Sequence, residues 1–112
     1  IANQYYSNLK RLMDLMRATF RNNDLPIVIG KISDSGDDED GRVWNFGELV
    51  QYSQEKFAAT QPNAAIVRTT NTYKYTDRYH YDNNGFIDLG KQFVQKLKYL
   101  INFHNLKIKF CS

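Results

Sequence analysis

Asp77 and His80 are the residues of this 112-residue sequence whose types and spacing best suit acid–base chemistry. A histidine acts as a base toward a serine when a third group holds its other ring nitrogen and fixes the tautomer and orientation of the ring. A carboxylate three residues before the histidine can do this. The pair therefore suits the acid and base half of a hydrolytic triad, whose nucleophile must come from elsewhere.

The same pair also has a structural interpretation, in which His80 is an ordinary loop histidine bonded to Asp77 or to nearby backbone. An Asp-x-x-His spacing arises often by chance, so spacing alone favours this interpretation. The flanking residues favour the chemical one. Asp82 or Asn83 can cap the helix predicted to follow, and Gly85 lets the chain turn sharply into it. The histidine would then stand at a rigid helix entrance.

The elements that must position this pair alternate between helices and strands. Apolar residues at helical spacing indicate helices, and nearly unbroken apolar runs indicate strands buried on both faces, as in a parallel sheet. The predicted helices cover about residues 3–22, 46–57 and 84–101, and the predicted strands cover 25–32, 64–67 and, more weakly, 106–110. Met13 and Met16 fall on the apolar face of the first helix and are predicted to be core. This order predicts an α/β fold, a three-layer α/β/α sandwich around a parallel sheet.

Two predicted loops leave the carboxyl ends of the strands, where ligands bind in open α/β sheets. The acidic loop, residues 33–41, lacks the pattern of a calcium-binding loop and is interpreted as a solvated surface loop. Residues 68–79 are polar and tyrosine-rich, show no period, and are predicted to be a loop that ends at the Asp77 and His80 pair. We therefore expect the two loops to share one cleft.

Two buried parallel strands do not make a stable sheet alone, because each needs neighbouring strands and helices over both faces. We therefore expect residues 1–112 to be the C-terminal portion of one domain, an expectation that agrees with a first residue, Ile1, that is not methionine. The missing strands would come from an N-terminal segment of the same product or from a companion chain.

Composition excludes several classes. The net charge of +3 is scattered over the chain and gathers in no basic stripe, which argues against nucleic-acid binding. No run approaches the roughly 20 apolar residues that span a bilayer, and no signal-peptide pattern precedes the first helix. The single Cys111 can form no internal disulfide and is interpreted as an incidental thiol, so the compartment stays open. His104 is interpreted as a surface histidine, and we expect neither a metal site nor a cofactor.

The stretch from Asp77 to Phe93, which reads DRYHYDNNGFIDLGKQF, resembles the last conserved block of SGNH-type hydrolases. It is most similar to the carbohydrate acetylesterases related to sialate O-acetylesterases and family six acetyl xylan esterases. In these enzymes an Asp-x-x-His-Tyr-Asp block precedes a helix with a Leu-Gly pair, here Leu89 and Gly90. The run from Leu25 to Ser33 and the helix after it also resemble the penultimate strand and helix of that family.

The resemblance implies a serine esterase that removes acetyl groups from carbohydrate, with His80 as general base and Asp77 orienting its ring. Secretion or a periplasmic location would follow by analogy only. The family's serine and its oxyanion-hole glycine and asparagine belong to earlier blocks without a counterpart here. Ser33 and Ser35 lack the glycine-flanked turn of a nucleophile. Because oxyanion donors are worth about 10²- to 10³-fold each, we expect this chain alone to be inactive.

Aromatic residues near the predicted cleft are candidates for binding the sugar. Trp44 either stacks on a sugar ring or anchors the acidic loop against the core. Tyr79 and Tyr81, with Tyr73 and Tyr75, either line a carbohydrate groove or pack half-exposed. The alternative for the whole chain is a non-catalytic α/β binding or assembly domain, in which Asp77 and His80 are structural. A nucleotide-binding half is disfavoured because no glycine-rich phosphate loop is present.

Overall fold

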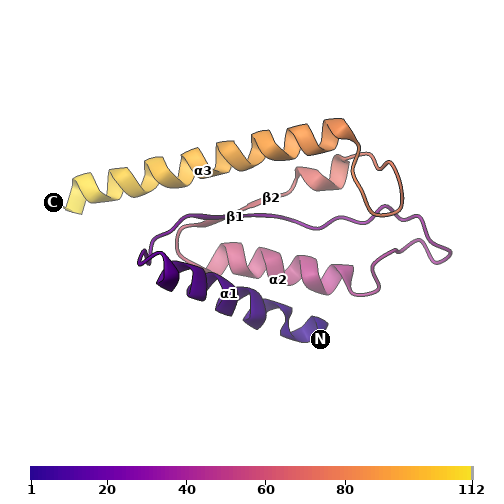
Figure 1. The fold of residues 1–112 in the computed structure, drawn as a ribbon, viewed down its shortest axis with the longest axis horizontal. Helices are drawn as coiled ribbons and strands as arrows, with labels where there is room; N and C mark the ends of the chain where they lie inside the picture. Colours follow the sequence, from indigo (N-terminus) through magenta and orange to yellow (C-terminus); the bar gives the residue numbers. More distant parts are fainter. Residues whose placement is uncertain (112) are drawn as a thin grey trace.

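The computed structural model describes residues 1–111, with side chains as far as Phe110, so the expectation for the Cys111 thiol lies outside the described side chains. Three helices and two strands alternate along the chain (Figure 1). In order, the elements are the 3-10 helix η1 (Ala2–Gln4), α1 (Tyr5–Thr19), β1 (Ile27–Gly30), α2 (Gly47–Thr60), β2 (Ala64–Val67), the 3-10 helix η2 (Thr69–Thr72) and α3 (Asn83–Cys111).

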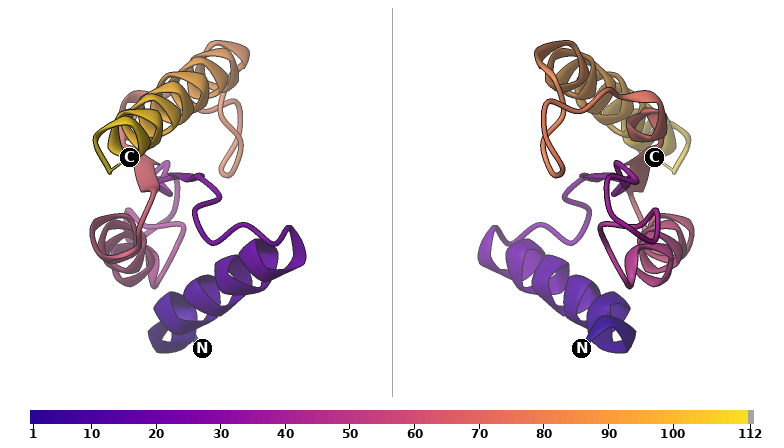
Figure 2. Two further views of the ribbon diagram at one scale, coloured as in Figure 1. Left: turned by 90° about the vertical axis from the view of Figure 1, so that its left-hand side faces the viewer. Right: turned by 90° about the vertical axis from the view of Figure 1, so that its right-hand side faces the viewer.

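The two strands form a parallel sheet with helices on both sides. Ile27 pairs with Ala64 and Gly30 pairs with Val67, so the two carboxyl ends meet at one edge. Helix α3 covers one face and contacts both strands, whereas α2 covers the other face and α1 packs on α2. Figures 1 and 2 show these three layers from different sides. The predicted α/β/α arrangement is confirmed, as a part of such a fold.

The core lies between the sheet and the two helices that cover it. Its most buried apolar side chains come from the strands and from the facing helix positions: Ile27, Phe57, Ile66, Val67 and Leu100. A Cβ at Gly30 would lie 3.4 Å from Phe93 and 3.6 Å from Leu89, so the missing side chain lets α3 approach β1 closely. β1 itself is only half-buried beyond Ile27, which corrects the expectation of burial on both faces. It has only β2 beside it among the described residues.

The predicted final strand at 106–110 is wrong, because α3 continues as one helix to Cys111. The helical period does not stop at Ile101. The rings of Tyr99 and Phe103, four residues apart, stack with centroids 6.2 Å apart, and the Lys107 amine lies 4.9 Å from the Phe103 ring centre. These contacts support a helix that continues through residues 106–110. Apolar and basic residues alternate there, but no glycine or proline ends the helix. His104 therefore lies within α3 and not after it.

Helix α1 buries a different face from the one predicted. Its one buried side chain is Arg17, which donates hydrogen bonds to the carbonyls of Leu25 at 3.1–3.2 Å and of Pro62 at 2.6 Å. Met16 is 41% exposed, so its placement in the core is wrong, while Met13 is half-buried. Leu12, Leu15 and Phe20 are exposed as well. Much of the apolar stripe of α1 is therefore left uncovered by the elements that the structure describes.

None of the described helices is long and apolar enough to cross a membrane.

Candidate active site

Residues 74–82 form a narrow hairpin that presents Asp77 and His80 at its tip. The Thr76 N–H donates to the His80 carbonyl at 2.9 Å, and the Asp82 N–H donates to the Lys74 carbonyl at 2.8 Å. Tyr75 and Tyr81 pair between these bonds as an antiparallel bridge. The segment 68–79 was predicted to be irregular throughout. It instead contains η2 and one side of this hairpin.

The carboxylate of Asp77 holds the His80 ring. Nδ1 of His80 lies 2.8 Å from Oδ2 and 3.0 Å from Oδ1 of Asp77. Because an ionised carboxylate only accepts hydrogen bonds, Nδ1 carries the ring proton, and Nε2 of the neutral ring is an acceptor. Nε2 has no hydrogen-bond partner among residues 1–111, and 67% of the His80 side chain is exposed. This tautomer and exposure suit a base that receives a proton from outside the hairpin.

The backbone fixes the carboxylate in turn. The N–H groups of Tyr79 and His80 both donate to Oδ1 of Asp77 at 2.7 Å. The N–H of Tyr79, the His80 ring and the N–H of His80 lower the pKa of Asp77 below its ordinary value. Asp77 therefore stays ionised at neutral pH and is held in one orientation by the backbone.

Helix α3 begins directly against the base of the hairpin. Of the two predicted caps Asp82 is the one used, since its Oδ1 accepts from the Gly85 N–H at 2.8 Å. A Cβ at Gly85 would lie 3.1 Å from Cβ of Tyr81 and 3.2 Å from Cβ of Tyr73. Gly85 thus permits a close approach between the helix and the hairpin, and the first turn of α3 supports the segment that carries the histidine.

Tyr75 and Tyr81 of the hairpin point their hydroxyl groups toward Ser33. Oγ of Ser33, a residue only 8% exposed, lies 2.5 Å from the Tyr75 hydroxyl and 2.8 Å from the Tyr81 hydroxyl. The Tyr81 ring contacts the rings of Tyr75, Tyr73 and Phe86 at centroid distances of 5.1–5.6 Å. Of these residues, Ser33 was predicted only as a poor nucleophile. Its contact with Tyr75 and Tyr81 has no local signal in the sequence.

The acidic loop is organised by its first carboxylate. Oδ1 of Asp34 accepts from the N–H groups of Gly36 and Val43, and Oδ2 accepts from the N–H of Trp44, at 2.8–3.0 Å. Partial burial acts to raise the pKa of Asp34, but these donors outweigh it and lower the pKa below the ordinary value. Sequence reasoning missed this role, although an aspartate at the start of a loop is a common turn-former.

The acidic loop contacts the tip of the hairpin at the right-hand end of Figure 1. Oγ of Ser35 donates to the Arg78 carbonyl at 2.8 Å, and the Arg78 guanidinium lies 3.9 Å from the Asp38 carboxylate. The rings of Trp44 and Tyr79 lie side by side with centroids 5.4 Å apart. Both rings are partly exposed, so an aromatic surface lies next to Asp77 and His80.

Every serine with a described side chain has a hydrogen-bond partner other than His80. Ser33 bonds to two tyrosines and Ser35 to the Arg78 carbonyl, while Ser7 and Ser53 bond to backbone carbonyls within their own segments. No serine within 1–111 is hydrogen-bonded to the His80 ring. Also within the described residues, no three His, Cys, Asp or Glu side chains gather as metal ligands.

A charged cluster closes the carboxyl ends of the two strands. Glu55 of α2 accepts from Lys31 at 3.0 Å, and both of its carboxylate oxygens accept from Arg68 at 2.7–2.8 Å. Hydrogen bonding to Arg68, with a smaller contribution from Lys31, lowers the pKa of Glu55 to about 2 against the opposing effect of burial. The cluster ties α2 to both strands at the end of the sheet from which the two loops leave.

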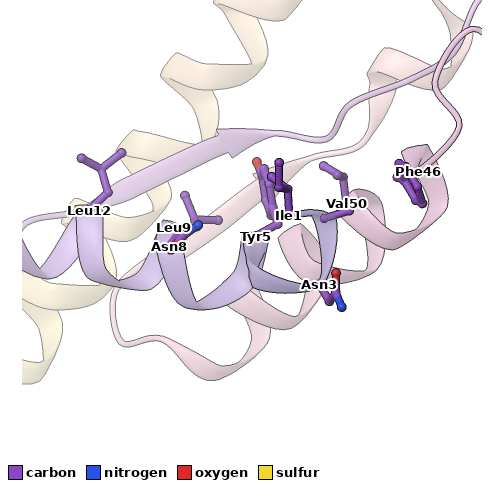
Figure 3. A pocket seen from close by; sticks show the side chains of 9 residues that line it. Ile1, Asn3, Tyr5, Asn8, Leu9, Leu12, Phe46 and Val50 are labelled. Carbon is purple, nitrogen blue, oxygen red and sulfur yellow. The ribbon is translucent and has the colours of Figure 1, made fainter.

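A separate apolar pocket of about 800 Å³ lies between the start of α1 and the start of α2. Figure 3 shows Leu9 and Leu12 of α1 and, from the segment that begins α2, Phe46 and Val50. Its lining includes no residue of the hairpin and none of the acidic loop. The pocket is therefore distinct from the candidate active site.

The sequence matches a protein-family model described as "Carbohydrate esterase, sialic acid-specific acetylesterase" over residues 1–99. The matched range includes both strands, the acidic loop, the hairpin and the greater part of α3. No curated protein and no solved structure has significant similarity to the chain.

Proposed function

Because the chain belongs to the sialic acid-specific acetylesterase family of carbohydrate esterases, we propose that it supplies the His80 base and the Asp77 carboxylate of a Ser-His-Asp triad. The triad removes acetyl groups from carbohydrate. The single observation that best supports this assignment is the 2.8 Å bond from His80 Nδ1 to Asp77, which leaves Nε2 exposed as an acceptor. A ring held in this tautomer is ready to take a serine proton.

The reaction then follows the usual two stages of serine catalysis. Nε2 of His80 takes the hydroxyl proton of the serine as its oxygen attacks the acetyl carbonyl, and Asp77 stabilises the resulting imidazolium. The imidazolium gives its proton to the departing sugar oxygen, which leaves an acetyl-serine. Water attacks this ester as Nε2 accepts one of its protons. The imidazolium then gives that proton to the serine oxygen as the ester bond breaks, and the acetic acid released ionises to acetate.

The nucleophile and the oxyanion donors of this scheme are provided from outside residues 1–112, by an N-terminal segment or a companion chain. The exposed apolar residues of α1, including Leu12, Met16 and Phe20, support a further packed layer at this place. The apolar pocket in Figure 3 is continuous with that surface through Leu12. Residues 1–112 are then the C-terminal portion of the catalytic domain and have no activity by themselves.

The aromatic pair provides a binding surface for the sugar. Trp44 and Tyr79 are 38% and 53% exposed, and their rings lie beside the hairpin tip. Aromatic faces pack well on the apolar faces of sugar rings while polar edges stay in water. Tyr81 is half-buried and its hydroxyl is bonded to Ser33, so it holds the hairpin that carries Tyr79.

Hydrolysis of p-nitrophenyl acetate by the full-length protein tests the assignment. His80→Ala is expected to lower kcat by about 10⁶-fold and Asp77→Asn by about 10⁴-fold, as loss of these triad members does. His104→Ala is the matched control, because His104 lies 21 residues beyond the start of α3, about 30 Å along the helix. Full activity in His80→Ala would reject the triad and favour the non-catalytic interpretation, in which the pair only shapes the hairpin.

A further inference from the structure

Ser33 is hydrogen-bonded to the hairpin that carries the proposed base. It follows β1 by three residues, and its Oγ is the point at which Tyr75 and Tyr81 meet. These two tyrosines stand on opposite sides of the hairpin, two residues before Asp77 and one residue after His80. One buried hydroxyl therefore contacts both sides of the hairpin base at once.

The backbone before Ser33 is itself held firmly. The Ile32 N–H donates to the side-chain oxygen of Gln54 at 2.9 Å, and the Ile32 carbonyl accepts from the Gln51 amide at 2.8 Å. The Lys31 carbonyl accepts from the Thr70 hydroxyl at 2.6 Å. The segment that carries Ser33 is thus fixed to the end of the sheet and to α2. Through Ser33, Tyr75 and Tyr81 are held at a defined position relative to the sheet.

We propose that Ser33, Tyr75 and Tyr81 form a positioning cluster that sets the orientation of His80 relative to the nucleophile, with Ser33 as its central residue. This proposal rests on the proposed function and gives Ser33 a role other than nucleophile. A serine hydroxyl has one proton and two lone pairs, which suffices for both tyrosine bonds at the same time. The contacts within the dyad, Asp77 to Tyr79 and to His80, are local. Ser35 also holds the tip of the hairpin through the Arg78 carbonyl, but Ser33 is the residue that bonds to both of its sides.

The expected effect is on the chemical step and not on binding. Misplacing a catalytic group by about 1 Å costs about 10²-fold in rate. Ser33→Ala removes both tyrosine bonds but leaves Asp77 and His80 in contact, so we expect kcat to fall by about 10- to 100-fold with KM little changed. Tyr75→Phe keeps the ring and removes one bond, and we expect a smaller loss in the same direction.

The experiment measures kcat and KM of the full-length protein on p-nitrophenyl acetate for these two variants and for Ser53→Ala. Ser53 is a matched control, since it is also buried and donates only to the Leu49 carbonyl within α2. We expect Ser53→Ala to keep the wild-type kcat, and circular dichroism to show that all three variants are folded. If Ser33→Ala fails to fold, Tyr75→Phe decides the question by the same kcat measurement.

Failure of the positioning cluster and failure of the proposed function give different results. Wild-type kcat in Ser33→Ala and Tyr75→Phe, together with an inactive His80→Ala, would overturn the positioning cluster and leave the triad in place. An active His80→Ala would overturn the proposed function, and the positioning of a base with it. A kcat loss in Ser53→Ala equal to that in Ser33→Ala would show a general effect of lost buried hydroxyls, and would also overturn the proposal.

Discussion

Replacing Glu55 by glutamine should lower the free energy of unfolding at neutral pH. This difference from the wild type should be lost in acid. The carboxylate of Glu55 accepts from Lys31 and, through both oxygens, from Arg68, and its pKa falls from an ordinary 4.5 to about 2. A group whose pKa is lower in the folded state stabilises that state above its unfolded pKa. The contribution is lost as the pH falls from about 4.5 through about 2.

The magnitude follows from the same two pKa values. At about 1.4 kcal/mol for each pKa unit, the shift corresponds to at most about 3–4 kcal/mol. The Glu55 side chain is 30% exposed and that of Arg68 is 59% exposed, so solvent weakens the pair. We therefore expect Glu55→Gln to cost about 1–2 kcal/mol of unfolding free energy at pH 7.

The assay is urea unfolding of the full-length protein and of Glu55→Gln at several pH values from 7 to 2.5. Their difference in unfolding free energy should stay constant from pH 7 to pH 5 and shrink below pH 4.5. Glu48→Gln is the control, because Glu48 is 83% exposed and 3.5 Å from Arg42, and we expect a change below about 0.5 kcal/mol. A difference for Glu55→Gln that is the same at pH 7 and pH 2.5 would refute the electrostatic reasoning.

Two further predictions concern the helix entrance and the aromatic surface. Gly85→Ala should be less stable than Gly90→Ala by about 1–2 kcal/mol in urea unfolding, because its new Cβ meets the Tyr81 Cβ at 3.1 Å, while Gly90 has open space and gains helix propensity. Equal stability of the two variants would contradict the close packing at Gly85. Trp44→Ala should raise KM for an acetylated oligosaccharide about fivefold, equivalent to about 1 kcal/mol of lost stacking, and leave KM for p-nitrophenyl acetate unchanged. The exposed Tyr52→Ala serves as control, and an unchanged oligosaccharide KM in Trp44→Ala would remove Trp44 from the sugar site.

The sequence correctly predicted elements that are bounded on both sides by turn-forming or charged residues. β2 was predicted at 64–67 and observed at Ala64–Val67, because Pro62 and Asn63 form a turn before it and Arg68 ends the apolar run. Asn63 takes the left-handed backbone conformation, with φ at 51°, that such a turn requires. The end of α3 has no glycine or proline to mark where the helix ends, and the short alternating stretch at residues 106–110 was wrongly predicted to be a strand.

Burial was harder to predict than secondary structure, because an apolar stripe does not say what covers it. Met16 and Phe20 lie on the stripe of α1 that predicted a core, yet both are exposed among the described residues. The buried residue on α1 is Arg17, whose guanidinium replaces water for the carbonyls of Leu25 and Pro62. Period alone cannot foresee a charge held by backbone carbonyls.

The contacts of the candidate site also differ in how far the sequence could predict them. The contact between Asp77 and His80 spans three residues, so the spacing of the pair was sufficient to predict it. The bonds from Ser33 to Tyr75 and Tyr81 span 42 and 48 residues, and they exist only because the sheet brings the end of β1 next to the hairpin. A local motif can thus encode the contact between the two proposed catalytic groups, whereas the bonds that hold their hairpin depend on tertiary contacts. A peptide of residues 74–86 lacks Ser33, so NMR should show the turn around Asp77 but no single orientation of the Tyr75 and Tyr81 rings.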